Sequence, residues 1–177
     1  THSEDLAAEV MALRHWQAEL AGGRWIGATW PEEYGGRGAG ALDHFIVQEE
    51  LARARAPELV GRIGINLVGP TLLAHGTPEQ KARWLPRILA ADELWCQLFS
   101  EPGAGSDLAG LRTRAVRDGS DWIINGQKIW TSGAHFADFG IMVTRTDPDA
   151  AKHAGLTFFF LDMKSPGVEV RPIKQIS

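Results

Sequence analysis

The main chemical signal of this sequence is a loop of small and polar residues, Ser-Glu-Pro-Gly-Ala-Gly-Ser-Asp at 100–107. It follows an apolar segment, 94–99, that is typical of a strand. Glycine lets a main chain approach a ligand closely, and successive exposed amides bind anions or carbonyl oxygens. We therefore expect a tight loop whose backbone N–H groups face a ligand.

A second polar stretch, Asn-Gly-Gln-Lys-Ile-Trp-Thr-Ser-Gly, occupies 125–133. Trp130 lies in this stretch directly before two hydroxyl side chains, Thr131 and Ser132. An indole beside hydroxyl groups suits a planar heteroaromatic cofactor, because the ring packs on the flat face while the hydroxyls bond to its polar edge. The two loops together predict a cofactor site.

Other site chemistries fit the sequence poorly. Gly103, Gly105 and Gly110 do not match the dinucleotide fingerprint, and a strand rather than a helix is expected after them. No Gly-Lys-Ser/Thr follows the glycines, which excludes a P-loop. The histidines are scattered without metal-ligand spacing, so we expect no metal site. The sequence shows no Ser/His/Asp arrangement typical of a catalytic triad. Because both nucleotide-binding motifs are excluded, any nucleotide must be bound by strand and loop backbone and by hydroxyl groups.

Composition indicates an ordinary globular protein, with 44% hydrophobic and 23% charged residues among 177. The net charge of −4 and the lack of a basic cluster argue against a nucleic-acid partner, and the apolar runs are too short for membrane insertion. Cys96 is the single cysteine, so no intrachain disulfide can form and a cytoplasmic location is the default. We expect Cys96 to be an inert core thiol.

The first half of the chain has helical patterns. A helix is expected to end at Gly22-Gly23, a second to cover about 42–55, and a third to cover 63–75 with a kink or break at Pro70. Thr-Pro-Glu-Gln at 77–80 predicts the start of a fourth helix, with a capping box.

The second half has strand patterns. Strands are expected at 111–117, 122–124, 127–131, 139–144, 156–162 and 168–173, with a hairpin turn at Asn125-Gly126. The result is an α+β chain with a helical domain, 1–93, and a β domain, 94–177. Because the last expected strand has no closing turn, we interpret the chain as part of a longer polypeptide.

Several further segments carry a resemblance. They are Trp-Pro-Glu-Glu-Tyr-Gly-Gly-Arg-Gly at 30–38, Glu-Glu-Leu-Ala-Arg at 49–53, Gly-Thr-Pro-Glu-Gln-Lys at 76–81, Gly-Leu-Thr-Phe-Phe at 155–159 and Pro-Gly-Val-Glu-Val-Arg-Pro at 166–172. With the two loops, they make the chain resemble the acyl-CoA dehydrogenase family along essentially its whole length, in a bacterial-type subgroup. Gln-Leu-Phe-Ser at 97–100 is similar to members that act on bulky or steroid-derived acyl-CoAs.

The resemblance implies an all-α domain, 1–93, followed by a β-barrel or sandwich-like domain, 94–177, that is incomplete at its C-terminus. The family's C-terminal four-helix domain would be absent. It also implies FAD as cofactor, an acyl-CoA substrate and an electron-accepting flavoprotein as partner. Members form homo- or hetero-oligomers, dimers or tetramers, and act in fatty acid and lipid catabolism by beta-oxidation.

The resemblance also implies residue roles. Leu98, Phe99 and Ser100 would line the pyrimidine side of the flavin, where many relatives have Thr in place of Ser100. Gly105 and Ser106 would lie near the pyrophosphate and the thioester-bearing arm of CoA, which makes Ser106 a substrate contact too. Trp130 would pack beside the flavin ring, and Ser132 would hydrogen-bond around flavin N5 and O4. Thr131, between them, would be a further cofactor-binding residue. Gln97 stands where relatives have larger or apolar residues.

The implied reaction is α,β-desaturation of an acyl-CoA thioester, with hydride transfer to FAD. The family's catalytic Glu lies in the C-terminal domain, so we assign no catalytic residue here and expect the chain alone to be inactive. Two alternatives stay open. One is a related FAD-dependent oxidase or monooxygenase. The presence of Ser106, the hydroxyl expected beside the thioester, favours a CoA substrate over this alternative. The other is a non-catalytic subunit of a hetero-oligomer, which would not need Ser100, Trp130 and Ser132.

Overall fold

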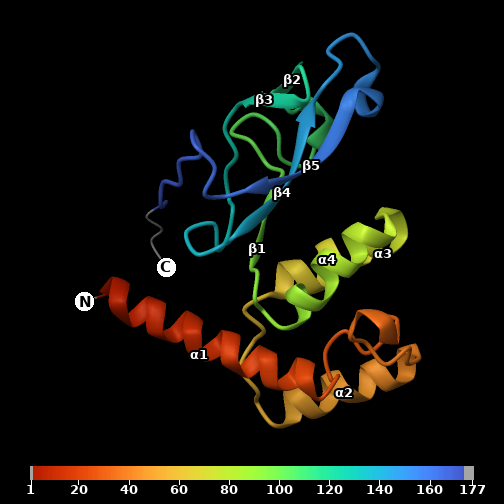
Figure 1. The fold of residues 1–177 in the computed structure, drawn as a ribbon. Coiled ribbons are helices and arrows are strands. Elements are labelled where there is room, and N and C mark those ends of the chain that lie inside the picture. Colours follow the sequence, from red (N-terminus) through yellow and green to blue (C-terminus); the bar gives the residue numbers. More distant parts are fainter. Residues whose placement is uncertain (1, 174–177) are drawn as a thin grey trace. The chain divides into compact units, whose positions relative to one another are not determined.

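The computed structural model describes residues 2–173, and its contacts divide them into two compact units. The first unit ends at Leu94 and the second begins at Trp95. The first unit is helical and the second contains a sheet (Figure 1). None of the described helices is both long and apolar enough to cross a bilayer.

The helical unit contains α1 (His2–Gly22), α2 (Ala41–Arg53), α3 (Gly69–His75) and α4 (Pro78–Leu89), with a short 3₁₀ turn at Glu32–Tyr34. The start of α4 confirms the predicted capping box. Thr77 Oγ1 accepts from Gln80 N at 3.3 Å, and Gln80 Oε1 accepts from Thr77 N at 2.9 Å. These bonds satisfy amides that lack a partner within the helix.

The irregularity expected at Pro70 is a π-helical turn, Gly64–Val68, that leads directly into α3. Proline has no N–H group, so it cannot donate to the carbonyl one turn before it. Gly69 N donates to Gly64 O in the wider π pattern, and the Thr71 hydroxyl donates to Leu67 O at 2.8 Å. The helix therefore continues past the proline with a local adjustment.

Gln17 is the polar exception in the apolar pattern of α1, and it is fully buried. Its Nε2 donates to Ile88 O and Leu89 O, at 3.0 and 3.1 Å, and its Oε1 accepts from Gly61 N at 2.8 Å. The side chain thus bonds to two carbonyls in the last turn of α4, where carbonyls lack the usual partner one turn further along the helix. It ties α1 to α4 from within the core.

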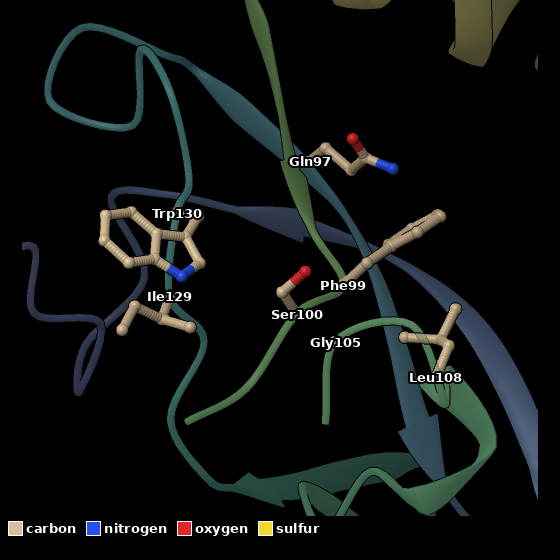
Figure 2. Close-up of a pocket in the computed structure, with 7 residues that line it drawn as sticks. All are labelled: Gln97, Phe99, Ser100, Gly105, Leu108, Ile129 and Trp130. Carbon is tan, nitrogen blue, oxygen red and sulfur yellow. The ribbon is translucent and has the colours of Figure 1, made fainter. Parts of the chain in front are cut away.

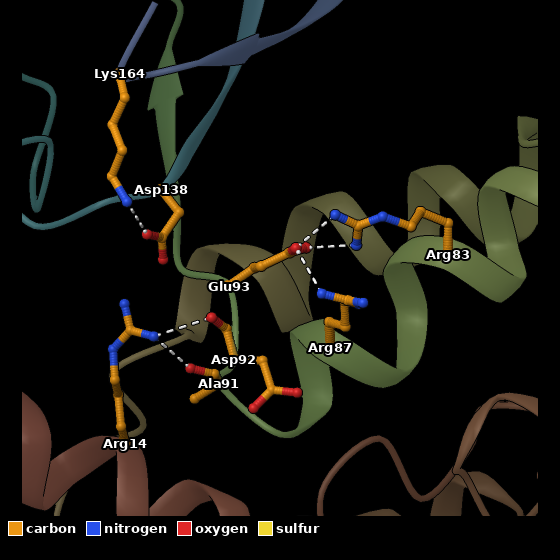
Figure 3. A network of polar contacts seen from close by, with 8 residues as sticks. All are labelled: Arg14, Arg83, Arg87, Ala91, Asp92, Glu93, Asp138 and Lys164. Atoms are coloured by element: carbon orange, nitrogen blue, oxygen red, sulfur yellow. Dashed lines mark hydrogen bonds and ion pairs between the residues drawn. The ribbon is translucent and has the colours of Figure 1, made fainter.

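The segment that leaves α4 is held by arginines (Figure 3). Arg14 donates to the carbonyls of Ala91 and Asp92. Glu93, which is 9% exposed, accepts two bonds from Arg83 and one from Arg87. Paired Arg–carboxylate geometry is the strong form of ion pair.

The second unit contains a mixed sheet of β1 (Trp95–Leu98), β2 (Arg114–Asp118), β3 (Asp121–Asn125), β4 (Phe139–Arg145) and β5 (Leu156–Asp162). Strand β4 pairs in parallel with β1 and antiparallel with β5, and meets β2 at its far end. Strand β3 pairs with β2. Among the described residues the sheet does not close into a barrel.

The prediction of a hairpin turn at Asn125-Gly126 is wrong. The turn between β2 and β3 instead uses Gly119, which supplies a positive φ of 60°. Gly126 follows β3 and is needed for close packing, because a Cβ there would overlap Thr113. Residues 127–131 form no strand, because Ile129 bonds to a loop carbonyl rather than to a sheet edge.

The strand expected at 168–173 is also absent. Gly167 has a φ of 88°, and Val168 N closes a turn onto Ser165 O. Pro172 has no N–H to donate to a ladder. The end of the expected domain, 174–177, lies outside the described residues.

The core of the sheet unit is formed by Cys96, Leu98, Ala137, Met142 and Met163. Side chains alternate between the two faces of a strand, so Cys96 and Leu98 of β1 enter this core while Gln97 lies on the other face. Burial raises the pKa of the Cys96 thiol to about 12, which agrees with an inert core thiol.

Candidate functional site

The polar loop after β1 and the loop that carries Trp130 enclose a hollow of about 160 Å³ (Figure 2). Two lining residues come from the Trp130 loop, and the others come from β1 and the loop that follows it. In the view of Figure 2 the Ser100 side chain lies between the rings of Trp130 and Phe99. The lining residues are Gln97, Phe99, Ser100, Gly105, Leu108, Ile129 and Trp130.

Backbone hydrogen bonds shape the first loop and join it to the second. Glu101 and Ala104 exchange two bonds, at 2.8 and 3.1 Å, so Pro102-Gly103 form the tip of a tight turn. Ile129 N donates to Ser100 O at 2.9 Å. This bond brings the two predicted loops side by side, although they are separate in the sequence.

A buried ion pair joins Glu101 of the first loop to Lys128 of the second, and the two side chains are 7% and 6% exposed. The Lys128 ammonium donates to Glu101 Oε1 at 2.8 Å, to Phe99 O at 3.0 Å and to Val143 O at 2.8 Å. An ammonium has three N–H donors, so this set uses all of them.

The Glu101 carboxylate also accepts from the backbone amides of Arg112 and Thr113, at 2.6 and 2.9 Å. Burial raises the pKa of Glu101, but the hydrogen bonds from Lys128, Thr113 and Arg112 outweigh it and lower the pKa to about 2. Burial lowers the pKa of Lys128, and the pair with Glu101 opposes that change. The carboxylate is ionised and fully engaged, so it is unsuited to accept a proton from a substrate.

Trp130 combines exposure with an unusual backbone. Its side chain is 62% exposed, and its φ of 60° lies in the left-handed region that bulky residues rarely adopt. Tight turns follow, with Ser132 N bonded to Trp130 O and Ala134 N to Thr131 O. Strained residues of this kind gather at functional sites, and here the strain presents a flat aromatic ring beside the hollow.

The structure brings together four of the predicted site residues, since Phe99, Ser100, Gly105 and Trp130 all line the hollow. The others lie elsewhere. The Leu98 side chain is in the hydrophobic core, and Ser106 and Ser132 are exposed outside the lining. Thr131 is half-buried and is also outside the lining.

Sequence reasoning passed over several residues of this region. Gln97 and Leu108 line the hollow, and Ile129 does so beside Trp130. The alternation of β1 could have found Gln97, because it shares a strand face with Phe99. The Glu101–Lys128 pair left no local signal, since the two residues are 27 positions apart.

Family models match both parts of the chain. The N-terminal domain of acyl-CoA dehydrogenase matches residues 2–92, and the middle domain of acyl-CoA dehydrogenase matches residues 96–177. The chain belongs to the acyl-CoA dehydrogenase family.

Similar acyl-CoA dehydrogenases include IpdE1 of Mycobacterium tuberculosis, which is 49% identical over 164 residues, covering 93% of this chain and 43% of the relative. Among solved structures, the Tcur3481-Tcur3483 steroid ACAD has a TM-score of 0.84 at 41% identity, over 93% of this chain and 42% of that one. The ChsE4-ChsE5 complex of M. tuberculosis has a TM-score of 0.82 at 43% identity, over 92% and 42%. The chain thus spans less than half the length of these relatives.

Acyl-CoA dehydrogenases depend on FAD, and the residues of the hollow fit a flavin. The Trp130 ring is exposed beside the opening. At Gly105, which lines the hollow, a Cβ would meet no atom within 4 Å, so ligand atoms can approach that backbone. Thr131 Oγ1 is enclosed and has no hydrogen-bond partner among the described residues. At about 160 Å³, the hollow is smaller than the roughly 300–1,000 Å³ of most ligand pockets.

No group of three or more His, Cys, Asp or Glu side chains in residues 2–173 could hold a metal ion.

Proposed function

We propose that this chain forms the helical domain and one wall of the FAD site of an acyl-CoA dehydrogenase that desaturates an acyl-CoA thioester between its α and β carbons. The observation that carries the proposal is the hollow between the Ser100 loop and the Trp130 loop. Its aromatic, hydroxyl and amide side chains match a planar ring with polar edges. When bound, FAD supplies the acceptor for the hydride that leaves the β carbon.

The residues of the wall then have distinct tasks. Trp130 packs beside the ring system, and the Ser100 hydroxyl and the Gln97 amide offer hydrogen bonds to its polar edge. Phe99 and Leu108 add apolar surface to the same hollow. Thr131 has an unused hydroxyl next to Trp130, and Ser132 follows it. Gly105 and Ser106 leave open backbone and a free hydroxyl for a phosphate or for the CoA arm.

A base for the α proton is not supplied by this wall. No acidic side chain is among the residues that line the hollow. Glu101, which directly follows Ser100, has a pKa lowered to about 2 and accepts hydrogen bonds on both oxygens. The resemblance puts the catalytic Glu in a C-terminal domain, so we propose that the chain by itself binds but does not dehydrogenate.

We extend the proposal to substrate and partners. Similarity to the Tcur3481-Tcur3483 steroid ACAD supports a bulky, steroid-derived acyl-CoA as substrate. The same structure and the ChsE4-ChsE5 structure bear the names of two proteins, which supports assembly with a second, related subunit. An electron-accepting flavoprotein, a role in lipid beta-oxidation and a cytoplasmic location complete the proposal.

Support for the cofactor comes from a further neighbour, a glutaryl-CoA dehydrogenase of Mycobacterium smegmatis in complex with FADH2, at 29% identity and a TM-score of 0.69.

The alternative of an oxidase with the same fold differs in what happens after substrate binding. In a protein that also contains the proposed C-terminal domain, reduction of bound flavin by an acyl-CoA under anaerobic conditions, followed by slow reoxidation in air, would favour the dehydrogenase.

The test of the site is a titration of the chain with FAD, followed by flavin fluorescence. Trp130→Ala is expected to weaken binding about tenfold or more, because stacking on an aromatic side chain contributes about 1–3 kcal/mol. Trp25→Ala is the matched control, since Trp25 is also exposed, at 46%, but lies in the helical unit. Equal affinity of the two variants, or no FAD binding by the unmodified chain, would contradict the proposal.

A further inference from the structure

The Glu101–Lys128 pair connects the two loops that form the hollow without itself lining it. We propose that this pair is a positioning latch, which sets the separation of the Ser100 loop from the Trp130 loop and thereby the geometry offered to the flavin. The inference rests on the proposed function for its ligand, but the latch can be tested in the chain without FAD.

Lys128 acts on the protein and not on a ligand. Its three donors go to Glu101, to the carbonyl of Phe99 and to the carbonyl of Val143 in β4. With no donor left and 6% exposure, the ammonium cannot bond to a cofactor phosphate or carbonyl. Instead it holds the end of β1 and the centre of β4 to the start of the Trp130 loop.

Glu101 extends the latch to a third segment. Its two oxygens accept from Lys128 and from the amides of Arg112 and Thr113, which precede β2. A carboxylate with this many donors has one well-defined position. Glu101 directly follows Ser100, so the carboxylate fixes the loop at the residue next to the hollow.

The latch residues are close in sequence to the residues that line the hollow, so a change in the pair should change the geometry of the site. Lys128 precedes Ile129, whose amide bonds to Ser100 O, and Trp130 follows. Each lining residue of the Trp130 loop is therefore within two positions of a latch residue. A buried pair of opposite charges brings no net charge to the cofactor, which suits a positioning role. Sites lose affinity when their supporting residues allow the walls to move.

The test removes both charges with little change in shape, in Glu101→Gln/Lys128→Met. Lys164→Met is the matched control, because Lys164 also pairs with one carboxylate in the same unit but is 77% exposed. Backbone amide exchange is measured without FAD, and affinity and visible circular dichroism are measured with FAD. We expect amide exchange at Ile129 and in 99–101 to become about tenfold faster or more in the double variant, with the β4–β5 amides unchanged.

With FAD, the double variant is expected to bind about tenfold more weakly or worse, and at saturation its flavin dichroism should differ from that of the unmodified chain. Lys164→Met should match the unmodified chain in every measurement. Spectra at saturation report the surroundings of the ring and not the amount bound, so a purely stabilising pair would leave them unchanged.

Unchanged exchange at Ile129 would overturn the latch, and so would faster exchange with unchanged affinity and dichroism. If the double variant does not fold, Glu101→Asp replaces it, because it keeps both charges but shortens the reach of the carboxylate. In that variant, unchanged exchange and dichroism would again overturn the proposal. If the unmodified chain binds no FAD, the proposed function fails, while the exchange measurement still decides whether the pair holds the loops.

Discussion

Acid should lower the free energy of unfolding of this protein, in part because Glu101 becomes protonated. The variant Glu101→Gln/Lys128→Met should not show this contribution of Glu101. The pKa of Glu101 is lowered from 4.5 to about 2. At about 1.4 kcal/mol for each pH unit, this difference corresponds to about 3 kcal/mol. Because the folded pKa is the lower one, the contribution is present above about pH 5 and disappears as the pH falls toward 2. By pH 3 about 2 kcal/mol of it should be lost.

The assay is urea unfolding at pH 6 and pH 3, at equal ionic strength, followed by far-ultraviolet circular dichroism. The unmodified chain should lose about 2 kcal/mol more than the double variant between the two pH values. Arg53→Gln, which removes exposed ion pairs on α2, is the control and should parallel the unmodified chain, since exposed pairs contribute little. Equal pH dependence of the double variant and the unmodified chain would refute the assignment of an ionised, hydrogen-bonded carboxylate.

Three further predictions concern stability and reactivity. Gln17→Leu should lower the free energy of unfolding by about 2–3 kcal/mol in urea titrations, because it leaves a buried amide and carbonyls unpaired; a loss below about 0.5 kcal/mol would count against the network. Gly126→Ala should cost about 1–3 kcal/mol through overlap with a neighbouring side chain, whereas Gly103→Ala, with open space around it, should change stability by less than about 0.5 kcal/mol. Cys96, whose pKa burial raises to about 12, should react with a disulfide reagent at pH 8 only after unfolding, and fast labelling of the native chain would show that it is not buried.

Local signals in the sequence were sufficient for much of the secondary structure. The capping box at Thr77 and Gln80 involves residues three apart, so its bonds form wherever a helix starts there. Strand β5 coincides with the expected segment 156–162 because its aromatic and β-branched residues favour extended structure. Pro70 was a reliable sign of irregularity, although its form, a π turn, depended on how the neighbouring carbonyls were satisfied.

Local signals failed where a distant partner changed the outcome. Asn125-Gly126 is a typical hairpin sequence, but Gly126 is used for packing on Thr113, and the turn falls at Gly119 instead. The segment 127–131 has strand-like residues, yet Lys128 and Ile129 bond to the Ser100 loop. A strand needs a partner edge, and propensity alone does not supply one.

The sequence by itself determined which groups are available to a cofactor: two loops with glycines, hydroxyls and Trp130, in an order that resembles acyl-CoA dehydrogenases. Only the tertiary structure decided which of them meet. Because Leu98 packs in the hydrophobic core and side chains alternate along a strand, Gln97 of β1 lies on the opposite face, where it lines the hollow. The Glu101–Lys128 pair forms only when folding buries both groups together, because burial of either charge alone is unfavourable.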